Sequence, residues 1–156
     1  MPRTTHREVV VAVARDGVIL FLRRAPGDDP AEPDPWAGLW WLPGGTLFPG
    51  EDPAAGARRL VAEETGWPIR GMRRLLKLSG HTPSSGTGEV TVFLSEAPDG
   101  EPDLRADYDA WSWDPPASFH DQDMEERWRL SPDFRSWMPL ATTIVSAVED
   151  SLPSEV

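Results

Sequence analysis

The 156-residue chain contains no cysteine, which excludes disulfide bonds and thiolate metal sites. It has only three histidines, and no two of them have the spacing of a zinc-binding pair. Lysine is almost absent as well, because 14 of the 15 basic residues are arginine. We interpret this bias as genomic composition before any functional signal.

Long hydrophobic runs and excess positive charge are also missing. No apolar stretch approaches the roughly 20 residues that span a membrane, and Met1-Pro2-Arg3 leads into polar residues rather than a signal peptide. A cytoplasmic location is therefore the default expectation. The net charge of −11 argues against a broad surface for a nucleic acid polymer or an anionic membrane. It is compatible with a small phosphorylated ligand that arrives with its own divalent cations.

The length fits one domain, spanning residues 1–156, with a proper hydrophobic core. A hydrophobic content of 39% and a charged content of 26% are typical of a globular protein. Within this domain the most informative stretch is 45–67, which follows a glycine-rich turn and predicts a loop that leads into a short helix. Asp52-Pro53 is a strong helix start, and Gly66 is a suitable left-handed terminating residue.

The same stretch resembles the Nudix box, G-x5-E-x7-R-E-U-x-E-E-x-G-U, in which U is a bulky aliphatic residue. Seven of its nine defined positions match, namely Gly45, Glu51, Arg59, Val61, Glu63, Glu64 and Gly66. Trp67 is a soft departure, because it is still large and apolar. Leu60 is a hard one, because the family has glutamate there, so the box is degenerate. The chain is thus similar to MutT-like members of the Nudix hydrolase superfamily.

The resemblance implies a site for Mg²⁺ or Mn²⁺ on the helix. Positions 60, 63 and 64 share one helix face, which in the family presents carboxylates to hard divalent cations. By resemblance Glu63 and Glu64 are catalytic metal ligands, and Glu51 and Arg59 support the loop–helix geometry. A further ligand is expected about six residues before a late-strand tryptophan. Counting back from Trp113 gives Asp107, and the neighbouring Asp103 and Asp109 stay open as alternatives.

Substrate contacts are predicted at the turn and before it. The glycines Gly44 and Gly45 are candidate substrate-binding residues, and arginines near the end of the second strand hold substrate in MutT-like proteins. Arg23 or Arg24 therefore contacts phosphate or base, unless both are solvated residues of a strand end. Trp36, Trp40 and Trp41 precede the turn. We favour packing for Trp41, we leave Trp36 and Trp40 open between packing and stacking on a base, and we keep Trp36 as a candidate substrate contact.

The remaining elements are read from local patterns. Strands are expected over 8–14, 18–23, 69–78, 89–95 and 109–114, with a hairpin turn at Asp16-Gly17 and loops over 25–38 and 81–88. A C-terminal helix is expected over about 132–149, with an apolar face for packing. This order suits the fold class implied by the resemblance, an α/β/α sandwich around a mixed β-sheet in a single Nudix domain.

Two functions compete. The first is a Mg²⁺-dependent hydrolase that cleaves the diphosphate bond of a nucleoside diphosphate linked to another group, or of a nucleoside triphosphate. The second is a Nudix-fold protein with lost or altered chemistry, because Leu60 can be neither a ligand nor a base. A replacement base could come from the acids and His120 of segment 115–130. The sequence identifies neither the substrate nor the oligomeric state, although many relatives are homodimers.

Overall fold

The computed structural model describes residues 6–27, 30–31, 37–82, 86–104, 107–120 and 134–152. The candidate Trp36 and the acids of 121–133 lie outside these ranges. The strands are β1 (Arg7–Arg15), β2 (Val18–Arg24), β3 (Trp40–Trp41), β4 (Gly44–Thr46), β5 (Arg73–Thr82), β6 (Gly86–Glu96) and β7 (Tyr108–Asp114). The helices are α1 (Pro53–Thr65), the short 3₁₀ helix η1 (Pro116–His120) and α3 (Phe134–Ser151).

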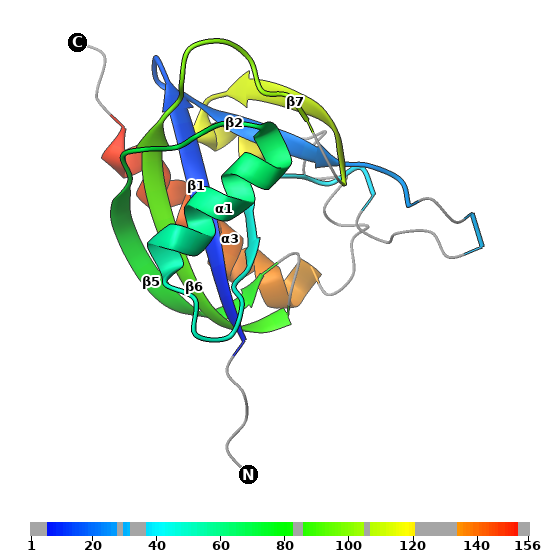
Figure 1. The fold of residues 1–156 in the computed structure, drawn as a ribbon. Coiled ribbons are helices and arrows are strands. Elements are labelled where there is room, and N and C mark those ends of the chain that lie inside the picture. The colour runs from blue at the N-terminus through cyan, green and yellow to red at the C-terminus, as the bar shows by residue number, and fades with distance from the viewer. Residues whose placement is uncertain are drawn as a thin grey trace.

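The strands form one mixed sheet in the order β3-β2-β1-β6-β5, with β4 paired to β1 and β7 paired to β2. β1 and β6 run parallel over eight residue pairs, and the other pairings are antiparallel. Helix α1 covers one face of the sheet and α3 covers the other (Figure 1). The predicted α/β/α sandwich around a mixed sheet is therefore confirmed.

Strand β1 is the centre of both cores. Val9, Val11 and Val13 face α1, whereas Val10 and Ala12 face α3, and all five are buried. This is the alternation that a two-sided strand requires, and it explains why residues 9–14 form an unbroken apolar run. None of the helices in the described ranges has the length and apolar character needed to cross a membrane.

The turns differ in how well local signals predict them. At Asp16-Gly17 both residues have positive φ, 51° and 83°, so the two-residue hairpin is confirmed. The flexible loop expected over 81–88 is shorter in the structure, because the β5–β6 ladder continues to the pair Thr82 and Gly86. β5 also begins later than expected. Its pairing with β6 starts at Arg73, which lies opposite Leu94, rather than at residue 69.

β5 ends the sheet within the described residues, and it carries exposed positive charge. Arg73, Arg74 and Lys77 are exposed on it, and Lys77 pairs with Glu89 of β6 at 3.2 Å. They are three of the four basic residues between 69 and 78, and the fourth, Arg70, precedes the strand. Charged side chains on an edge strand are a common protection against pairing with another sheet.

Helix α1 has the two ends that its sequence predicts. The Asp52 side chain accepts a hydrogen bond from the Ala55 N–H at 3.1 Å, and Pro53 occupies the first turn. Gly66 ends the helix with a φ of 72° and donates its N–H to the Ala62 carbonyl. These caps fix the helix so that Glu63 and Glu64 lie in its last turn.

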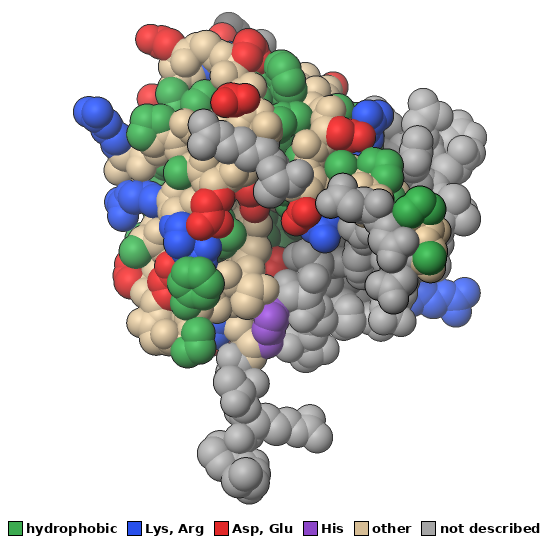
Figure 2. Space-filling model, turned by 45° about the vertical axis from the view of Figure 1, so that its right-hand side comes forward, with side chains coloured by type: hydrophobic (Ala, Val, Ile, Leu, Met, Phe, Trp, Pro, Cys, Tyr) green, Lys and Arg blue, Asp and Glu red, His purple; other side chains and the backbone are tan. Residues whose placement is uncertain are grey.

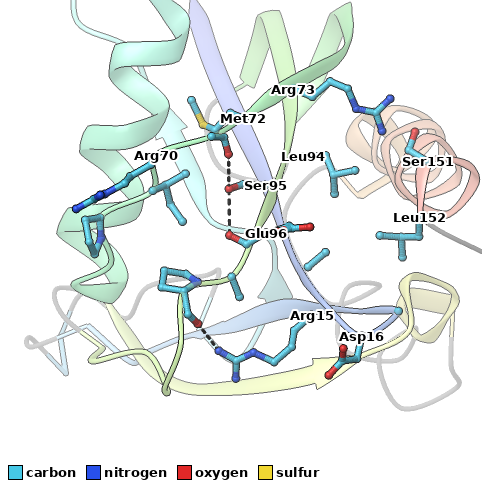
Figure 3. A pocket seen from close by; sticks show the side chains of 17 residues that line it. Arg15, Asp16, Arg70, Met72, Arg73, Leu94, Ser95, Glu96, Ser151 and Leu152 are labelled. Atoms are coloured by element: carbon cyan, nitrogen blue, oxygen red, sulfur yellow. Dashed lines mark hydrogen bonds between the residues drawn. The ribbon is translucent and has the colours of Figure 1, made fainter.

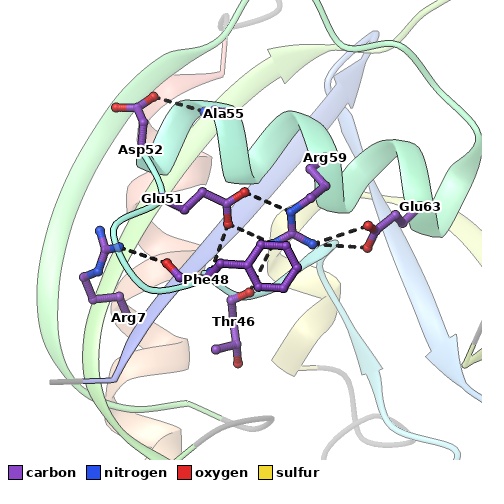
Figure 4. Close-up of polar contacts among 8 residues, drawn as sticks. All are labelled: Arg7, Thr46, Phe48, Glu51, Asp52, Ala55, Arg59 and Glu63. Atoms are coloured by element: carbon purple, nitrogen blue, oxygen red, sulfur yellow. Dashed lines mark hydrogen bonds and ion pairs between the residues drawn. The ribbon is translucent and has the colours of Figure 1, made fainter. Parts of the chain in front are cut away.

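The loop before α1 is tied to the helix by one ion pair (Figure 4). The Nε and Nη2 atoms of Arg59 each donate to a different carboxylate oxygen of Glu51 at 2.9 Å, and the Phe48 N–H donates to Glu51 at 3.0 Å. The hydrogen bonds from Arg59, together with that from Phe48, lower the pKa of Glu51 to about 2. The charged form of Glu51 is therefore the one that the folded state favours.

Gly44 allows the loop to approach the sheet. It pairs with Val10 of β1, and a Cβ atom at this position would overlap the carbonyl oxygen of Val9. Because the obstacle is backbone, it cannot rotate aside as a side chain would.

We therefore expect Gly44→Ala to destabilise the fold by about 2–3 kcal/mol, as overpacking of a tight contact does. In a domain of this size that corresponds to a melting temperature lower by roughly 4–12 °C. Gly71→Ala is the matched control, because a Cβ at Gly71 meets no atom within 4 Å. Thermal unfolding by circular dichroism compares the two, and equal melting temperatures would contradict the steric argument.

Glu51 makes stability depend on acid pH. Its folded pKa of about 2 lies below the unfolded value of about 4.3, so its stabilising effect is complete above about pH 5 and is lost as pH falls towards 2. Glu51→Gln should be less stable than wild type at pH 7 and should lose less stability between pH 5 and pH 2. Urea unfolding across this range measures the difference; parallel curves for the two proteins would rule out Glu51 as the group responsible.

Candidate functional site

Two adjacent carboxylates end helix α1, and they have different surroundings. Glu64 is buried, with 6% of its surface exposed, and it accepts a hydrogen bond from the Gly44 N–H at 3.2 Å. The Glu63 side chain is 56% exposed and faces Arg59, whose Nη1 lies 3.3 and 3.4 Å from its two oxygens. Glu64 is thus held between helix α1 and the glycine turn, whereas Glu63 is accessible to solvent.

The surroundings of Glu64 are short of positive charge. Burial raises the pKa of Glu64 to about 8, and the negative charges of Glu63 and Asp107 act in the same direction. The Gly44 N–H and the positive charge of Arg24 act in the opposite direction and offset only part of the effect. A buried carboxylate with acidic neighbours is a place where a further cation would be stabilised.

The second side of the site comes from β2 and β7. Arg24 pairs with Tyr108 across a bulge in this ladder, and the Ala25 N–H donates to the Asp107 carbonyl at 2.6 Å. Arg24 also hydrogen-bonds the hydroxyl group of the partly buried Tyr108, and the charges of Arg24 and Asp107 both affect the pKa of Glu64. Backbone pairing therefore brings Arg24 and Asp107 to the end of α1, although the three segments are distant in sequence.

Arg23 does not join this group. Its Nε donates to Asp109 at 2.7 Å, and its guanidinium lies over the Trp40 ring, 5.6 Å from the centroid. Neighbouring residues of a strand point to opposite faces, so Arg23 and Arg24 serve different surfaces. Of two candidates for the third acid, Asp109 thus forms an ion pair with Arg23, whereas the negative charge of Asp107 helps to raise the pKa of Glu64.

Gly45 and Leu60 meet where the box departs from its pattern. A Cβ at Gly45 would lie 3.3 Å from a methyl group of Leu60, so the leucine side chain covers the glycine. Leu60 is partly buried and packs against the α1-side core. The third position of the helix face is therefore apolar, and the turn beside it is closely packed.

Carboxylate oxygens are the donors that Mg²⁺ and Mn²⁺ prefer, so Glu63, Glu64 and Asp107 each offer the type of donor that suits a hard divalent cation. Within the described residues, however, no three His, Cys, Asp or Glu side chains converge closely enough to form a complete site. Figure 2 shows acidic side chains beside arginines and exposed hydrophobic groups on this face of the molecule. The arrangement is that of an incomplete acidic site with basic groups at its sides.

Sequence reasoning missed one residue beside the acidic site and was right about a tryptophan outside it. Tyr108, the one tyrosine of the chain, is fixed by Arg24 and could have been found only from the strand pairing. Trp41 packs in the α3-side core against Phe119, with ring centroids 5.3 Å apart, as expected. Its indole Nε1 is buried without a hydrogen-bond partner among the residues that the structure describes.

A separate hollow of about 1010 Å³ lies at the C-terminal end of β1 (Figure 3). It is bordered by the β1–β2 turn, the segment leading into β5, the end of β6 and the end of α3. Arg15, which lines it, is already bonded to the carbonyl oxygens of Pro98 and Gly100. None of the predicted site residues borders this hollow, so it is distinct from the acidic site.

Comparison with known proteins places this chain in a family. The model of the NUDIX domain matches residues 4–134. A Mycobacterium tuberculosis protein named "Putative 8-oxo-dGTP diphosphatase 2" is 29% identical over 143 residues, which cover 91% of this chain and 92% of the relative.

Solved structures agree in fold. The MutT NUDIX hydrolase of Burkholderia pseudomallei has a TM-score of 0.58 at 24% identity, covering 73% of this chain and 85% of that one. The NUDIX domain of Shewanella oneidensis NrtR, solved with ADP ribose, has a TM-score of 0.57 at 20% identity, covering 83% and 91%. The chain therefore belongs to the Nudix family, and its similarity is to the pyrophosphohydrolases of that family.

Proposed function

We propose that this protein is a Mg²⁺-dependent Nudix hydrolase that cleaves the diphosphate bond of a nucleoside triphosphate, or of a nucleoside diphosphate linked to another group. The observation that carries the proposal is the buried carboxyl group of Glu64, which lies beside Glu63 at the end of α1 and is affected by the charges of Asp107 and Arg24. Acids that bind a cation and an arginine that binds phosphate are the two components such a reaction needs.

Each residue of the group has a role that follows from its contacts. Glu64, Asp107 and Glu63 would hold the divalent cation, and when bound the cation offsets the charge of the diphosphate and activates the attacking water. Arg24 is oriented by its hydrogen bond to Tyr108 and would bind a phosphate oxygen. Glu51 and Arg59 hold the loop against the helix and do not need to touch the substrate.

The substrate class is argued from the relatives. The mycobacterial relative is named for 8-oxo-dGTP, and the NrtR domain was solved with ADP ribose. Nucleoside triphosphates are therefore the first compounds to test, and ADP ribose represents the linked diphosphates. Substrate contacts at Arg23, Gly44, Gly45 and Trp36, a homodimer and a cytoplasmic location stay predictions from the sequence.

Leu60 favours a second candidate, which is a Nudix protein with reduced or altered chemistry. Its side chain occupies the place of a charged residue on the metal-facing side of α1 and packs against Gly45. A leucine cannot take a proton from water. Hydrolysis then depends on a base from another segment or on the cation alone, and the rate is lower by the contribution of the missing base.

Glu64→Gln tests the proposed function directly. The amide keeps the size of the side chain but removes its charge, so the loss of a metal ligand should lower kcat by at least about 10²-fold. Phosphorus NMR with Mg²⁺ and 8-oxo-dGTP, dGTP, ADP ribose and a nucleotide sugar measures the products. Glu149→Gln, an exposed change on α3, is the control. Undiminished cleavage by the Glu64 variant would rule out this site.

Leu60→Glu tests whether the departure from the motif limits the rate. The new carboxylate would share a helix face with Glu63 and Glu64, and a positioned base contributes roughly 10²–10⁴-fold. We expect Mg²⁺-dependent hydrolysis to increase by at least roughly tenfold, as followed by phosphate release. Leu60→Gln controls for the lost apolar contact, since glutamine has the size of glutamate without its charge. A glutamate variant no faster than the glutamine variant would contradict the prediction.

A further inference from the structure

Phe48 is a large aromatic residue on the surface, in the loop between β4 and α1. Its side chain is 58% exposed, and Phe48 and Trp111 are the exposed large hydrophobic residues of the described part of the chain. Because the Phe48 ring is mostly outside the hydrophobic core, core packing does not explain its position, and its other contacts need to be considered.

The contact of Phe48 is the guanidinium of Arg59. The Cζ atom of Arg59 lies 3.9 Å from the centroid of the Phe48 ring, within the range of a cation–π interaction. The Phe48 backbone is held on both sides, because its N–H donates to Glu51 at 3.0 Å and its carbonyl accepts from Arg7 at 3.2 Å. Figure 4 shows the ring lying over the ion pair. The ring is thus fixed as a cover over one face of Arg59.

Arg59 has two carboxylate partners of unequal strength. It makes two hydrogen bonds of 2.9 Å to Glu51, but its bonds to Glu63 are 3.3 and 3.4 Å. Its two nitrogens that face Glu51 lie on one edge of the guanidinium, in the bidentate geometry that is strongest for arginine. The weaker bond leaves Glu63 able to exchange Arg59 for another cation.

We propose that Phe48 is a positioning residue that keeps Arg59 bound to Glu51, so that the carboxylate of Glu63 stays available to a divalent cation. The inference rests on the proposed metal-dependent function. Without the ring, the open face of Arg59 is hydrated and the guanidinium can turn towards Glu63. A fully paired Glu63 then competes less well for the cation, although Phe48 touches neither the cation nor the substrate.

Binding of Mn²⁺, measured by electron paramagnetic resonance, tests the proposal without reference to turnover. An exposed cation–π contact is worth about 0.5–1 kcal/mol, so Phe48→Ala should weaken Mn²⁺ binding roughly two- to fivefold. Phe48→Tyr keeps the aromatic face and should bind as wild type does. Phe48→Leu keeps an apolar cover without the cation–π contact and should fall with the alanine variant. Because Phe48 is exposed, all three variants should fold, and their melting temperatures check this.

The same substitution in a Glu63→Gln background separates positioning from general support of the loop. If Phe48 acts on the cation through Glu63, then adding Phe48→Ala to Glu63→Gln should leave Mn²⁺ affinity unchanged. Where Glu63→Gln binds too weakly for comparison, exchange of the Arg59 Nε–H by nitrogen NMR decides. The exchange should be slow in wild type and in Phe48→Tyr, and faster in Phe48→Ala.

The outcomes are distinct. A wild-type protein that binds no Mn²⁺ overturns both the metal-dependent function and this inference. Wild-type binding with no loss in Phe48→Ala overturns the inference alone, and so does an equal loss with and without Glu63→Gln. Unchanged exchange of the Arg59 Nε–H in Phe48→Ala likewise overturns it.

Discussion

The bidentate ion pair between Arg59 and Glu51 is the contact on which the geometry of the acidic site depends. It joins the loop to the middle of α1, and the same arginine reaches Glu63 in the last turn. Gly44, just before this loop, places its N–H against Glu64. One guanidinium therefore connects the loop that follows the glycine turn to Glu63, and the Gly44 N–H separately holds Glu64, so both terminal acids are positioned before any ligand is present.

The parts of the fold that sequence predicts well are those with local causes. Asp52 and Gly66 bound α1 because capping depends on residues within one turn. Asp16-Gly17 forms its hairpin because few residue pairs adopt two positive φ angles easily. The start of β5 and the length of the β5–β6 hairpin were placed wrongly, since both depend on a partner strand rather than on the segment itself.

For the site as well, local spacing is predictable from the sequence, whereas contacts between distant segments are not. The spacing of the box predicts Glu63 and Glu64 as ligands, and a count from Trp113 predicts Asp107, whose negative charge helps to raise the pKa of Glu64. The choice between Arg23 and Arg24 could not be made, because strand alternation separates their faces without indicating which face meets α1. Phe48 gave no sequence signal at all, since a lone apolar residue in a loop has no periodicity, and its role becomes visible only over Arg59.

The exposed cations of β5 bear on how copies of this chain behave at high concentration. Arg73, Arg74 and Lys77 lie along the strand that ends the described sheet. If a second copy added its own β5 to this edge, each ladder would bring guanidinium and ammonium groups into proximity and would cost free energy. A protein whose net charge is −11 thus has a concentration of positive charge on a strand at one edge of the described sheet. Fibre-like growth through the sheet is opposed by local repulsion, whatever the overall charge of the molecule.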